Sequence, residues 1–355
     1  MISVVNRYSN DAKKGSAKLA SFLLGALFFL LLGCSEQARE FSSLSGATMG
    51  TTYHITVVAK LSTQEQSELQ VQIDDRLKGI NQSMSTYIED SELSILNRSA
   101  IQQWQPVSGE LFDVLEMSQQ LHQLSSGAFD ITVGPLVNRW GFGPGFTIAK
   151  VPDQAEIEHI LSMIGAQYLQ LDSNGSQALR DIPIELDLSA IAKGYGVDKV
   201  AELLVAKGYN DFLVEIGGEI RVSGLNKFGN AWRIGIERPV ASMEKLVQKS
   251  IAVSDYAIAT SGDYRNFYEV ADKRYSHTID PRTGFPVEHN LVSVTVLDPL
   301  CARADGLATA FNVMGHEKAL LLANSEGIAA FFIIQTESGF QEFSSDAFKR
   351  IADAG

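Results

Sequence analysis

The order of strand-like and helix-like stretches is the feature that most constrains the fold of this chain. Runs rich in β-branched and aromatic residues, which are typical of β-strands, follow one another closely in the second half of the sequence. They lie at residues 212–216, 219–222, 232–237, 251–253, 291–297 and 329–334, and an earlier one lies at 51–58. Helical periodicity occurs in separate stretches, at residues 62–84, 108–125, 153–164, 190–207, 302–314 and 316–324. We therefore expect an α+β fold with largely antiparallel sheets and flanking helices, and not a regular βαβ array.

Local signals predict where several of these elements begin and end. Ser62 and Glu65 form a capping-box pattern just before an apolar helical repeat. Gly208 follows the helical stretch that begins after Ala190 and predicts its end. The pair Gly217 and Gly218 separates two strand-like runs and predicts a β-hairpin.

Composition limits the classes of protein that the chain can belong to. Its 355 residues, 45% of them hydrophobic and 20% charged, are enough for one large domain or two ordinary ones. The 42 acidic residues outnumber the 29 basic ones, and a net charge of −13 argues against a nucleic-acid-binding protein. Two cysteines exclude a disulfide-dense scaffold. No linker divides the region after the N-terminus into clear halves.

The N-terminus resembles an export signal. Basic residues precede an uncharged stretch at 19–33, LASFLLGALFFLLLG, which is shorter than the roughly 20 apolar residues of a membrane-spanning helix. The stretch ends in Leu-Leu-Gly-Cys, which resembles the bacterial lipobox. We therefore expect a lipoprotein signal peptide at 1–33, lipid attachment at Cys34, a tether at 34–43 and one folded domain at 44–350. The alternative is an uncleaved short anchor with an incidental cysteine.

Common nucleotide and hydrolase motifs are absent from the sequence. Gly194-Tyr195-Gly196 begins like a dinucleotide-binding fingerprint, but Lys199 stands where the third glycine is needed. There is no Walker A motif, no His-Glu-x-x-His motif and no Gly-x-Ser-x-Gly motif. Nucleotide chemistry would therefore need another scaffold.

Three polar clusters are nevertheless candidates for a site. Asp305 and Thr309 lie four residues apart on a predicted helix, and two oxygen ligands on one helix face suit Mg²⁺; the alternative is a capping Asp and a core Thr. Residues 185–194 place acids, a hydroxyl and Lys193 at a strand-to-helix junction, where anions bind, although a solvated helix start would look the same. His277 lies in a turn-rich segment and is a candidate base or phosphate ligand, although a lone His is more often structural.

Small and aromatic residues form a fourth candidate. Residues 127–130 and 140–143 combine glycines with Phe129, Trp140 and Phe142, as contact with a planar ring requires. Residues of this kind also occur commonly in a protein core.

Together these clusters resemble the motifs of the ApbE family of FAD:protein FMN transferases. The matching motifs occur in the family's order at residues 46–51, 84–87, 127–135, 187–194, 214–218, 260–265, 277–284 and 304–309. The resemblance extends over about residues 45–348 and implies an ApbE-like fold.

The resemblance implies an enzyme that splits the diphosphate of FAD. It would attach FMN through its phosphate to a Thr or Ser hydroxyl of an acceptor flavoprotein subunit and release AMP. In the family, such acceptors belong to membrane redox pumps of the Nqr/Rnf type. Together with the lipid anchor, this implies a location at the cell inner membrane, on the periplasmic side.

The resemblance also assigns residues to the site. Mg²⁺ would be bound by the backbone oxygen of Ala190 and the side chains of Asp305 and Thr309, and His277 would be the catalytic residue. Contacts to FAD fall on Met49, Tyr87, Ala128, Phe129, Asp130, Asp187, Lys193 and Ile279. Two positions differ within the family: some members have a carboxylate where this chain has Ala308, and some have an acid in place of Lys193.

Two other functions would use the same residues. With water as the acceptor, the site would be an FAD pyrophosphatase that yields free FMN and AMP. A non-catalytic flavin-binding lipoprotein would bind FAD without turnover, but the co-occurrence of Asp305, Lys193 and His277 favours an enzyme.

Overall fold

The computed structural model describes residues 38–143, 151–239, 247–262, 267–270 and 273–354. The predicted signal peptide and Cys34 lie outside the described residues. From Glu40 onward the chain forms one compact unit. None of the helices in the described part of the chain has the length and apolar character needed to cross a membrane.

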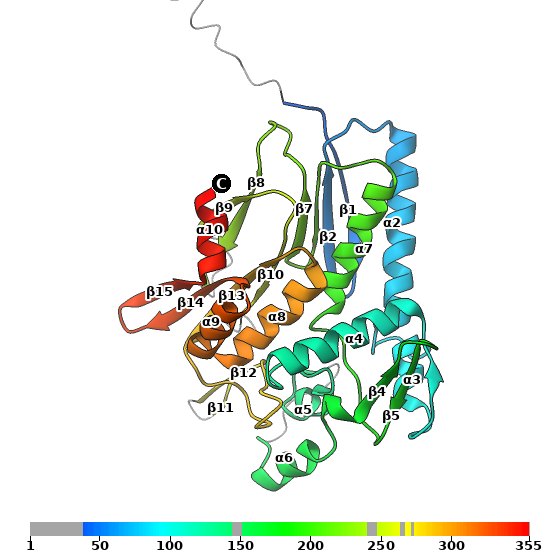
Figure 1. Cartoon of the computed structure of the whole chain (residues 1–355), viewed down its shortest axis with the longest axis vertical. Helices are drawn as coiled ribbons and strands as arrows, with labels where there is room; N and C mark the ends of the chain where they lie inside the picture. The colour runs from blue at the N-terminus through cyan, green and yellow to red at the C-terminus, as the bar shows by residue number, and fades with distance from the viewer. Residues whose placement is uncertain (1–37, 144–150, 240–246, 263–266, 271–272, 355) are drawn as a thin grey trace, which may run out of the picture. The chain divides into compact units, whose positions relative to one another are not determined.

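The centre of the fold is an eight-stranded sheet in which all neighbouring strands run antiparallel (Figure 1). Across the sheet the order is β1 (Ser42–Thr48), β2 (Thr51–Val57), β6 (Phe212–Ile216), β7 (Glu219–Ser223), β10 (Ala257–Ser261), β13 (Leu291–Asp298), β14 (Ala329–Thr336) and β15 (Gly339–Ser344). The predicted α+β class and antiparallel pairing are therefore confirmed. Ile216 pairs with Glu219, which confirms the hairpin predicted at Gly217 and Gly218.

Three smaller sheets complete the strand content of the described residues. The first contains β3 (Gln105–Pro106), β5 (Gln177–Arg180) and β4 (Leu169–Asp172). The other two are hairpins, β8 (Trp232–Glu237) with β9 (Val247–Val253), and β11 (Phe267–Val270) with β12 (Lys273–Ser276).

Both faces of the large sheet are covered, which explains the continuous apolar run in β14. On one face lie α2 (Thr63–Met84), α4 (Gly109–Leu124), α7 (Ala192–Ala206) and α8 (Cys301–Met314), which share a core with Phe332. On the other face, the β8–β9 hairpin and α10 (Asp346–Ala354) pack around Phe331. Because adjacent strand residues point to opposite faces, a strand buried on both faces is apolar throughout.

Three of the remaining helices lie in the lower part of the view in Figure 1: α3 (Glu92–Arg98), α5 (Gly134–Arg139) and α6 (Gln154–Leu161). Helix α9 (His316–Ser325) lies beside α8 and β14, and the 3₁₀ turn η1 (Ala166–Tyr168) precedes β4. A third apolar cluster contains residues of α5 and α6 together with Trp140 and Ile279.

Several predicted boundaries are confirmed and some are shifted. Ser62 caps α2 and forms the expected capping box with Glu65. Helix α6 ends at Leu161, three residues before the predicted end, and the chain then turns at Gly165, whose φ of 138° is rarely adopted by other residues. Strand β1 begins at Ser42, two residues inside the predicted tether, because Ser42 pairs with Val57.

Candidate active site

Helices α7 and α8 meet near their N-terminal ends, and each carries a carboxylate that caps the other. Asp198 on α7 accepts hydrogen bonds from the backbone N–H groups of Cys301 (3.0 Å) and Ala302 (2.9 Å). Asp305 on α8 accepts one from the N–H of Gly194 (3.1 Å). The first N–H groups of a helix have no partner within the helix and carry partial positive charge. These bonds therefore fix Asp305 against the first turn of α7.

Glycine at position 194 is required by this close approach of the two helices. A Cβ atom added to Gly194 would lie 2.4 Å from the backbone oxygen of Cys301, and one added to Gly196 would lie 3.0 Å from Cε of Met49. The two glycines that resemble the start of a dinucleotide fingerprint thus serve helix packing. The antiparallel sheet also agrees with the absence of a Rossmann site.

The three predicted metal ligands each have an oxygen without a hydrogen-bond donor. In a regular helix the N–H of Gly194 would donate to the carbonyl of Ala190, but here it donates to Asp305. Among the described residues, no donor is bonded to the Ala190 carbonyl, to Oδ1 of Asp305 or to the Thr309 hydroxyl. Asp305 is only 5% exposed. The side-chain oxygens of Asp305 and Thr309 are not fully enclosed, so they stay accessible to a ligand. Oxygens without donors on a carboxylate, a hydroxyl and a carbonyl fit a site that binds a hard cation.

The ligand chemistry suits Mg²⁺ in particular. Within the described residues, no group of three His, Cys, Asp or Glu side chains is placed to bind a metal ion. The candidate set instead offers one carboxylate, one hydroxyl and one carbonyl. Mg²⁺ commonly uses one or two carboxylates and completes its coordination with phosphate oxygens and water. The donor set therefore fits a cation that is bound together with a phosphate-containing substrate.

Lys193 connects this site to a second buried carboxylate. Its Nζ lies 2.8 Å from Oε1 of Glu219 and 3.7 Å from Oδ2 of Asp305. Burial, together with the charge of Asp305, raises the pKa of Glu219 to about 8. Burial also raises the pKa of Asp305, and although burial opposes the charge on Lys193, the two carboxylates raise the pKa of its ammonium. The result is a cluster of two buried acids and one half-buried lysine.

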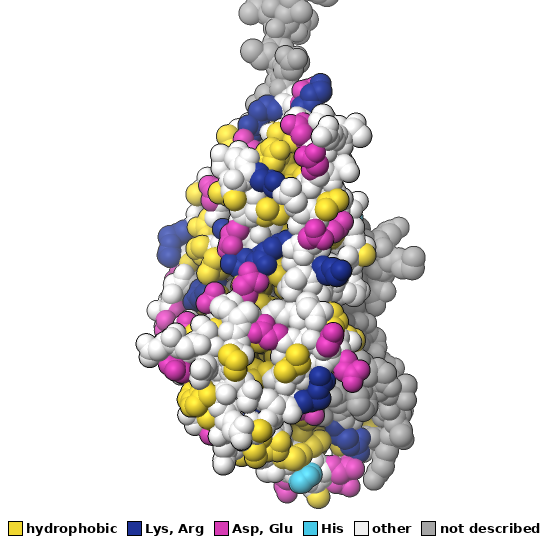
Figure 2. All heavy atoms as spheres, turned by 90° about the vertical axis from the view of Figure 1, so that its right-hand side faces the viewer, with side chains coloured by type: hydrophobic (Ala, Val, Ile, Leu, Met, Phe, Trp, Pro, Cys, Tyr) yellow, Lys and Arg dark blue, Asp and Glu magenta, His cyan; other side chains and the backbone are white. Residues whose placement is uncertain are grey.

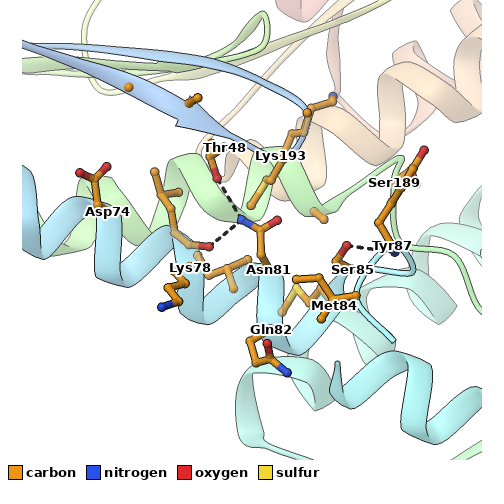
Figure 3. A pocket seen from close by; sticks show the side chains of 18 of the residues that line it. Thr48, Asp74, Lys78, Asn81, Gln82, Met84, Ser85, Tyr87, Ser189 and Lys193 are labelled. Atoms are coloured by element: carbon orange, nitrogen blue, oxygen red, sulfur yellow. Dashed lines mark hydrogen bonds between the residues drawn. The ribbon is translucent and has the colours of Figure 1, made fainter. Parts of the chain in front are cut away.

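A large cavity lies beside this cluster. It has a volume of about 1340 Å³, and Lys193 lines it (Figure 3). The other walls come from the β1–β2 hairpin, α2, the segment after α2 and the start of α7. Ligand pockets usually measure about 300–1,000 Å³, so this one has room for a molecule as large as a dinucleotide. On the side of the molecule that carries α2, acidic, basic and apolar side chains are interspersed (Figure 2).

The hairpin turn between β1 and β2 forms one edge of the cavity. Met49 and Gly50 both have positive φ angles, 48° and 71°, as a two-residue type I′ hairpin turn requires. Nδ2 of Asn81 on α2 donates to Oγ1 of Thr48 (3.0 Å) and so ties the hairpin to the helix (Figure 3). Tyr87, 74% exposed, lies on the cavity lining after the end of α2.

A second cavity of about 260 Å³ shares one lining residue with the first. Thr86 lines both, and Asp187 lines the smaller one. Oδ1 of Asp187 accepts a hydrogen bond from the N–H of Ser189 (2.8 Å), which lines the larger cavity. Four of the predicted FAD contacts thus line one of two neighbouring cavities: Met49, Tyr87, Asp187 and Lys193.

The other four predicted FAD contacts line neither cavity and stay predictions. Ala128, Phe129 and Ile279 are buried, and Phe129 and Ile279 belong to apolar clusters. Asp130 is also buried, and its carboxylate accepts hydrogen bonds from both the N–H and the hydroxyl of Thr132 (2.8 and 2.7 Å). In this structure Asp130 therefore stabilises the loop before α5.

His277 follows β12 and also lies outside the lining of both cavities. Its ring is 6.2 Å from the ring of Phe142, at an angle of 70°. Nδ2 of Asn312 is within 3.4 Å of the hydroxyl of Thr278, which follows His277. Since Asn312 comes three residues after Thr309 on α8, this contact links the His277 segment to the helix face that carries the metal ligands.

Sequence reasoning missed two residues of this region, Asp198 and Glu219. For Glu219 the hairpin register holds a signal, since the two-glycine turn pairs it with Ile216, a buried apolar position. An acid opposite a buried side chain is unusual and marks a position to examine. Asp198 has no such local signal, because its partners come from α8 and β7.

A large cavity lined by a half-buried lysine, which also contacts the carboxylate of a hard-cation ligand set, is typical of enzymes that transfer phosphate-linked groups. The chain belongs to the ApbE family, whose sequence model matches residues 49–332. This membership confirms the predicted family and the prediction of a transferase.

Relatives match this chain over nearly its whole length. The FAD:protein FMN transferase of Vibrio cholerae is 45% identical over 325 residues, which cover 91% of this chain and 96% of the relative. That of Haemophilus influenzae is 40% identical, with coverage of 95% and 99%. Among solved structures, the flavin transferase ApbE of Vibrio cholerae has a TM-score of 0.81 at 44% identity, covering 88% of this chain and 99% of its own. The flavinyl transferase ApbE of Pseudomonas stutzeri has a TM-score of 0.81 at 37% identity, covering 90% and 98%. The predicted ApbE-like fold is therefore confirmed.

Proposed function

We propose that this chain transfers FMN from FAD to a Thr or Ser hydroxyl of an acceptor protein and releases AMP. The names of its relatives support the reaction. The observation that carries the proposal is the set of three oxygens without donors, on Ala190, Asp305 and Thr309. These residues do not line the cavity of dinucleotide size, but Lys193, which does, lies 3.7 Å from Asp305. Ala190, Asp305 and Thr309 would bind Mg²⁺. When bound, the cation supplies positive charge that polarises the diphosphate and stabilises the leaving phosphate.

The cavity residues suit the parts of FAD. The exposed ring of Tyr87 and the side chain of Met49 offer apolar surfaces for stacking of a flat ring system. Lys193 supplies positive charge at the start of α7, where a diphosphate is also attracted by the helix terminus. Substrate orientation would therefore come from the β1–β2 turn, the segment after α2 and the start of α7.

The reaction exchanges one phosphorus–oxygen bond for another. The acceptor oxygen forms a bond to the phosphorus of the FMN half, and the bond from that phosphorus to the bridging oxygen breaks. AMP leaves with the electron pair, and the hydroxyl proton passes to a base. We assign this role to His277, the residue that the family resemblance identifies as catalytic. A positioned base typically accelerates such a step by about 10²–10⁴-fold.

The acceptor and the location follow from the same family resemblance and from the N-terminal sequence. We propose lipid attachment at Cys34, a position on the periplasmic side of the inner membrane, and acceptors in redox pumps of the Nqr/Rnf type. Mass spectrometry of the N-terminal peptide from membranes tests the anchor. A diacylated peptide that begins at Cys34 is expected, and an intact N-terminus at Met1 would contradict it.

The activity is tested by incubating the full chain with FAD, Mg²⁺ and an Rnf-type acceptor subunit. We expect the acceptor to gain the mass of one FMN while AMP appears in equal amount, and we expect both to stop when a chelator removes Mg²⁺. Free FMN without a mass gain would show a pyrophosphatase instead. Bound flavin with no AMP would show a binding protein, and either outcome would contradict the proposal.

A further inference from the structure

Glu219 is a buried ionisable residue to which the proposed reaction gives no role. It is 4% exposed, and its Oε1 lies 2.8 Å from Nζ of Lys193. Its other oxygen, Oε2, is buried and has no hydrogen-bond partner among the described residues. A carboxylate that is buried at this cost and only half paired calls for an explanation beyond packing.

The surrounding groups leave an excess of negative charge at this point. Asp198 is paired with Arg221 at 2.6 Å, so those two charges balance. Burial raises the pKa of the Cys301 thiol well above its usual range, so the thiol is neutral. Lys193 then stands alone against two carboxylates, Glu219 and Asp305. When both carboxylates are ionised, as they are above about pH 8, one negative charge therefore has no cation among the described side chains around it.

The position of the ammonium decides which carboxylate keeps that charge. Nζ of Lys193 is 0.9 Å closer to Glu219 than to Asp305, at 2.8 Å against 3.7 Å. The turn at Gly217 lies beside the lysine stem, since a Cβ added there would be 3.5 Å from Cδ of Lys193, an ordinary contact distance. Without Glu219, the nearest counter-charge for the ammonium would be Asp305 itself. The lysine would then neutralise the only carboxylate of the metal ligand set.

We propose that Glu219 is a positioning residue that sets the charge of the metal site through Lys193. By pairing with the ammonium, it leaves Asp305 with the negative charge that a divalent cation needs. The same pairing keeps Lys193 at the cavity wall, where it faces a bound diphosphate. This inference rests on the metal site of the proposed function and adds to it a residue outside the ligand set.

The test measures cation affinity without turnover. Mn²⁺ is titrated into the full chain at pH 8.5 without FAD, and free Mn²⁺ is followed by its electron paramagnetic resonance signal. Glu219→Gln is expected to weaken Mn²⁺ binding by about 10–100-fold, as the loss of groups behind metal ligands typically does. Glu215→Gln, a similar change in the same hairpin at a residue that contacts His54, is the matched control and should leave binding unchanged.

A second substitution separates charge balance from direct ligation. The double variant Glu219→Gln with Lys193→Met removes the charge of both members of the ion pair. Asp305 is then the only charged side chain of the three. We expect this double variant to recover most of the lost affinity, and Glu219→Asp to bind nearly as well as the unmodified chain. Circular dichroism of each variant checks that it is folded.

The outcomes distinguish this inference from the proposed function. Equal Mn²⁺ affinity in Glu219→Gln and the unmodified chain would overturn the role of Glu219 and leave the metal site intact. A double variant that binds as weakly as Glu219→Gln would also overturn it, because Glu219 would then act as a ligand or through the fold. An unmodified chain that does not bind Mn²⁺ at all would overturn both proposals.

Discussion

Asp198 and Asp305 occupy equivalent places in the fold and differ in how completely they are paired. Each is buried on one of the two crossing helices and caps the first turn of the other. Asp198 accepts two backbone N–H groups and contacts Arg221 at 2.6 Å. Asp305 accepts one N–H group, and its cation, Lys193, is 3.7 Å away and closer to Glu219.

The difference separates a carboxylate that stabilises the fold from one that is available for chemistry. A buried acid with all its oxygens paired contributes to the stability of the fold through the hydrogen bonds and ion pairs that it makes. A buried acid with an unpaired oxygen costs stability and is retained where the site needs it. The same substitution, Asp to Asn, can therefore be made at both positions, and its effects on activity and on stability can be compared.

The largest expected effect is on activity, at Asp305. Asp305→Asn keeps an oxygen for the N–H of Gly194 but removes the charge of the metal ligand set. We expect FMN transfer to fall by at least about 100-fold, since cation binding supplies several kcal/mol of transition-state stabilisation. The free energy of unfolding should change by less than about 1 kcal/mol, because the substitution also removes an unfavourable buried charge. Transfer to an acceptor and urea denaturation measure the two quantities; a variant of normal activity would refute the assignment.

Asp198→Asn should have the opposite effect, because it should lower stability and leave activity nearly unchanged. The Asn side chain has one acceptor oxygen for two N–H groups and no charge to pair with Arg221. The free energy of unfolding should fall by about 2–4 kcal/mol, the cost of leaving buried partners unpaired. The transfer rate of the folded enzyme should stay close to that of the unmodified chain. Loss of activity without loss of stability would mean that the two carboxylates do not divide the roles in this way.

A smaller effect is expected from separating the helices that carry the two residues. In Gly194→Ala the new Cβ would lie 2.4 Å from the backbone oxygen of Cys301, so α7 and α8 must move apart. Overpacking of this kind typically costs about 1–3 kcal/mol. Gly79→Ala in α2 is the control, since nothing lies within 4 Å of its added Cβ. That substitution should stabilise the protein by about 0.5–1 kcal/mol, and thermal denaturation of both variants checks the contrast.

The smallest effect, counted per pH unit, is a dependence of stability on pH without added metal. Burial raises the pKa of Glu219 to about 8, whereas an unfolded glutamate has a value near 4.3. Between these values the folded chain holds a proton that the unfolded chain has lost, so stability should fall as pH rises from about 4.3 to 8. The slope from this one group is at most about 1.4 kcal/mol per pH unit. Denaturation of Glu219→Gln over the same range should show a shallower slope, and an unchanged slope would mean that Glu219 is not its source.

Elements with strong local signals were predictable from the sequence, and elements defined by distant partners were not. The capping box at Ser62 and the glycine pair at 217 and 218 set their ends by short-range bonds. Strand β10 was missed because its sequence, AIATS, is short and rich in small residues, and it becomes a strand by pairing with β7 and β13.

The site shows the same division. Asp305 and Thr309 were predicted because their spacing on one helix is visible in the sequence. Glu219 and Asp198 were missed because their meaning depends on residues 26 and 103 positions away, Lys193 and Cys301. The pairing that distinguishes Asp305 from Asp198 arises only when α7 and α8 are packed together, which no local pattern encodes.

The division of roles between the two carboxylates is tested most directly by the position of a bound cation in a crystal of the protein soaked with Mn²⁺. We predict an anomalous diffraction peak about 2.0–2.6 Å from the carbonyl of Ala190, a carboxylate oxygen of Asp305 and the hydroxyl of Thr309, the range of oxygen ligands around hard divalent cations. No peak is expected at Asp198. A peak elsewhere, with these three oxygens left without a cation at saturating Mn²⁺, would contradict the assignment of Asp305 as the metal ligand.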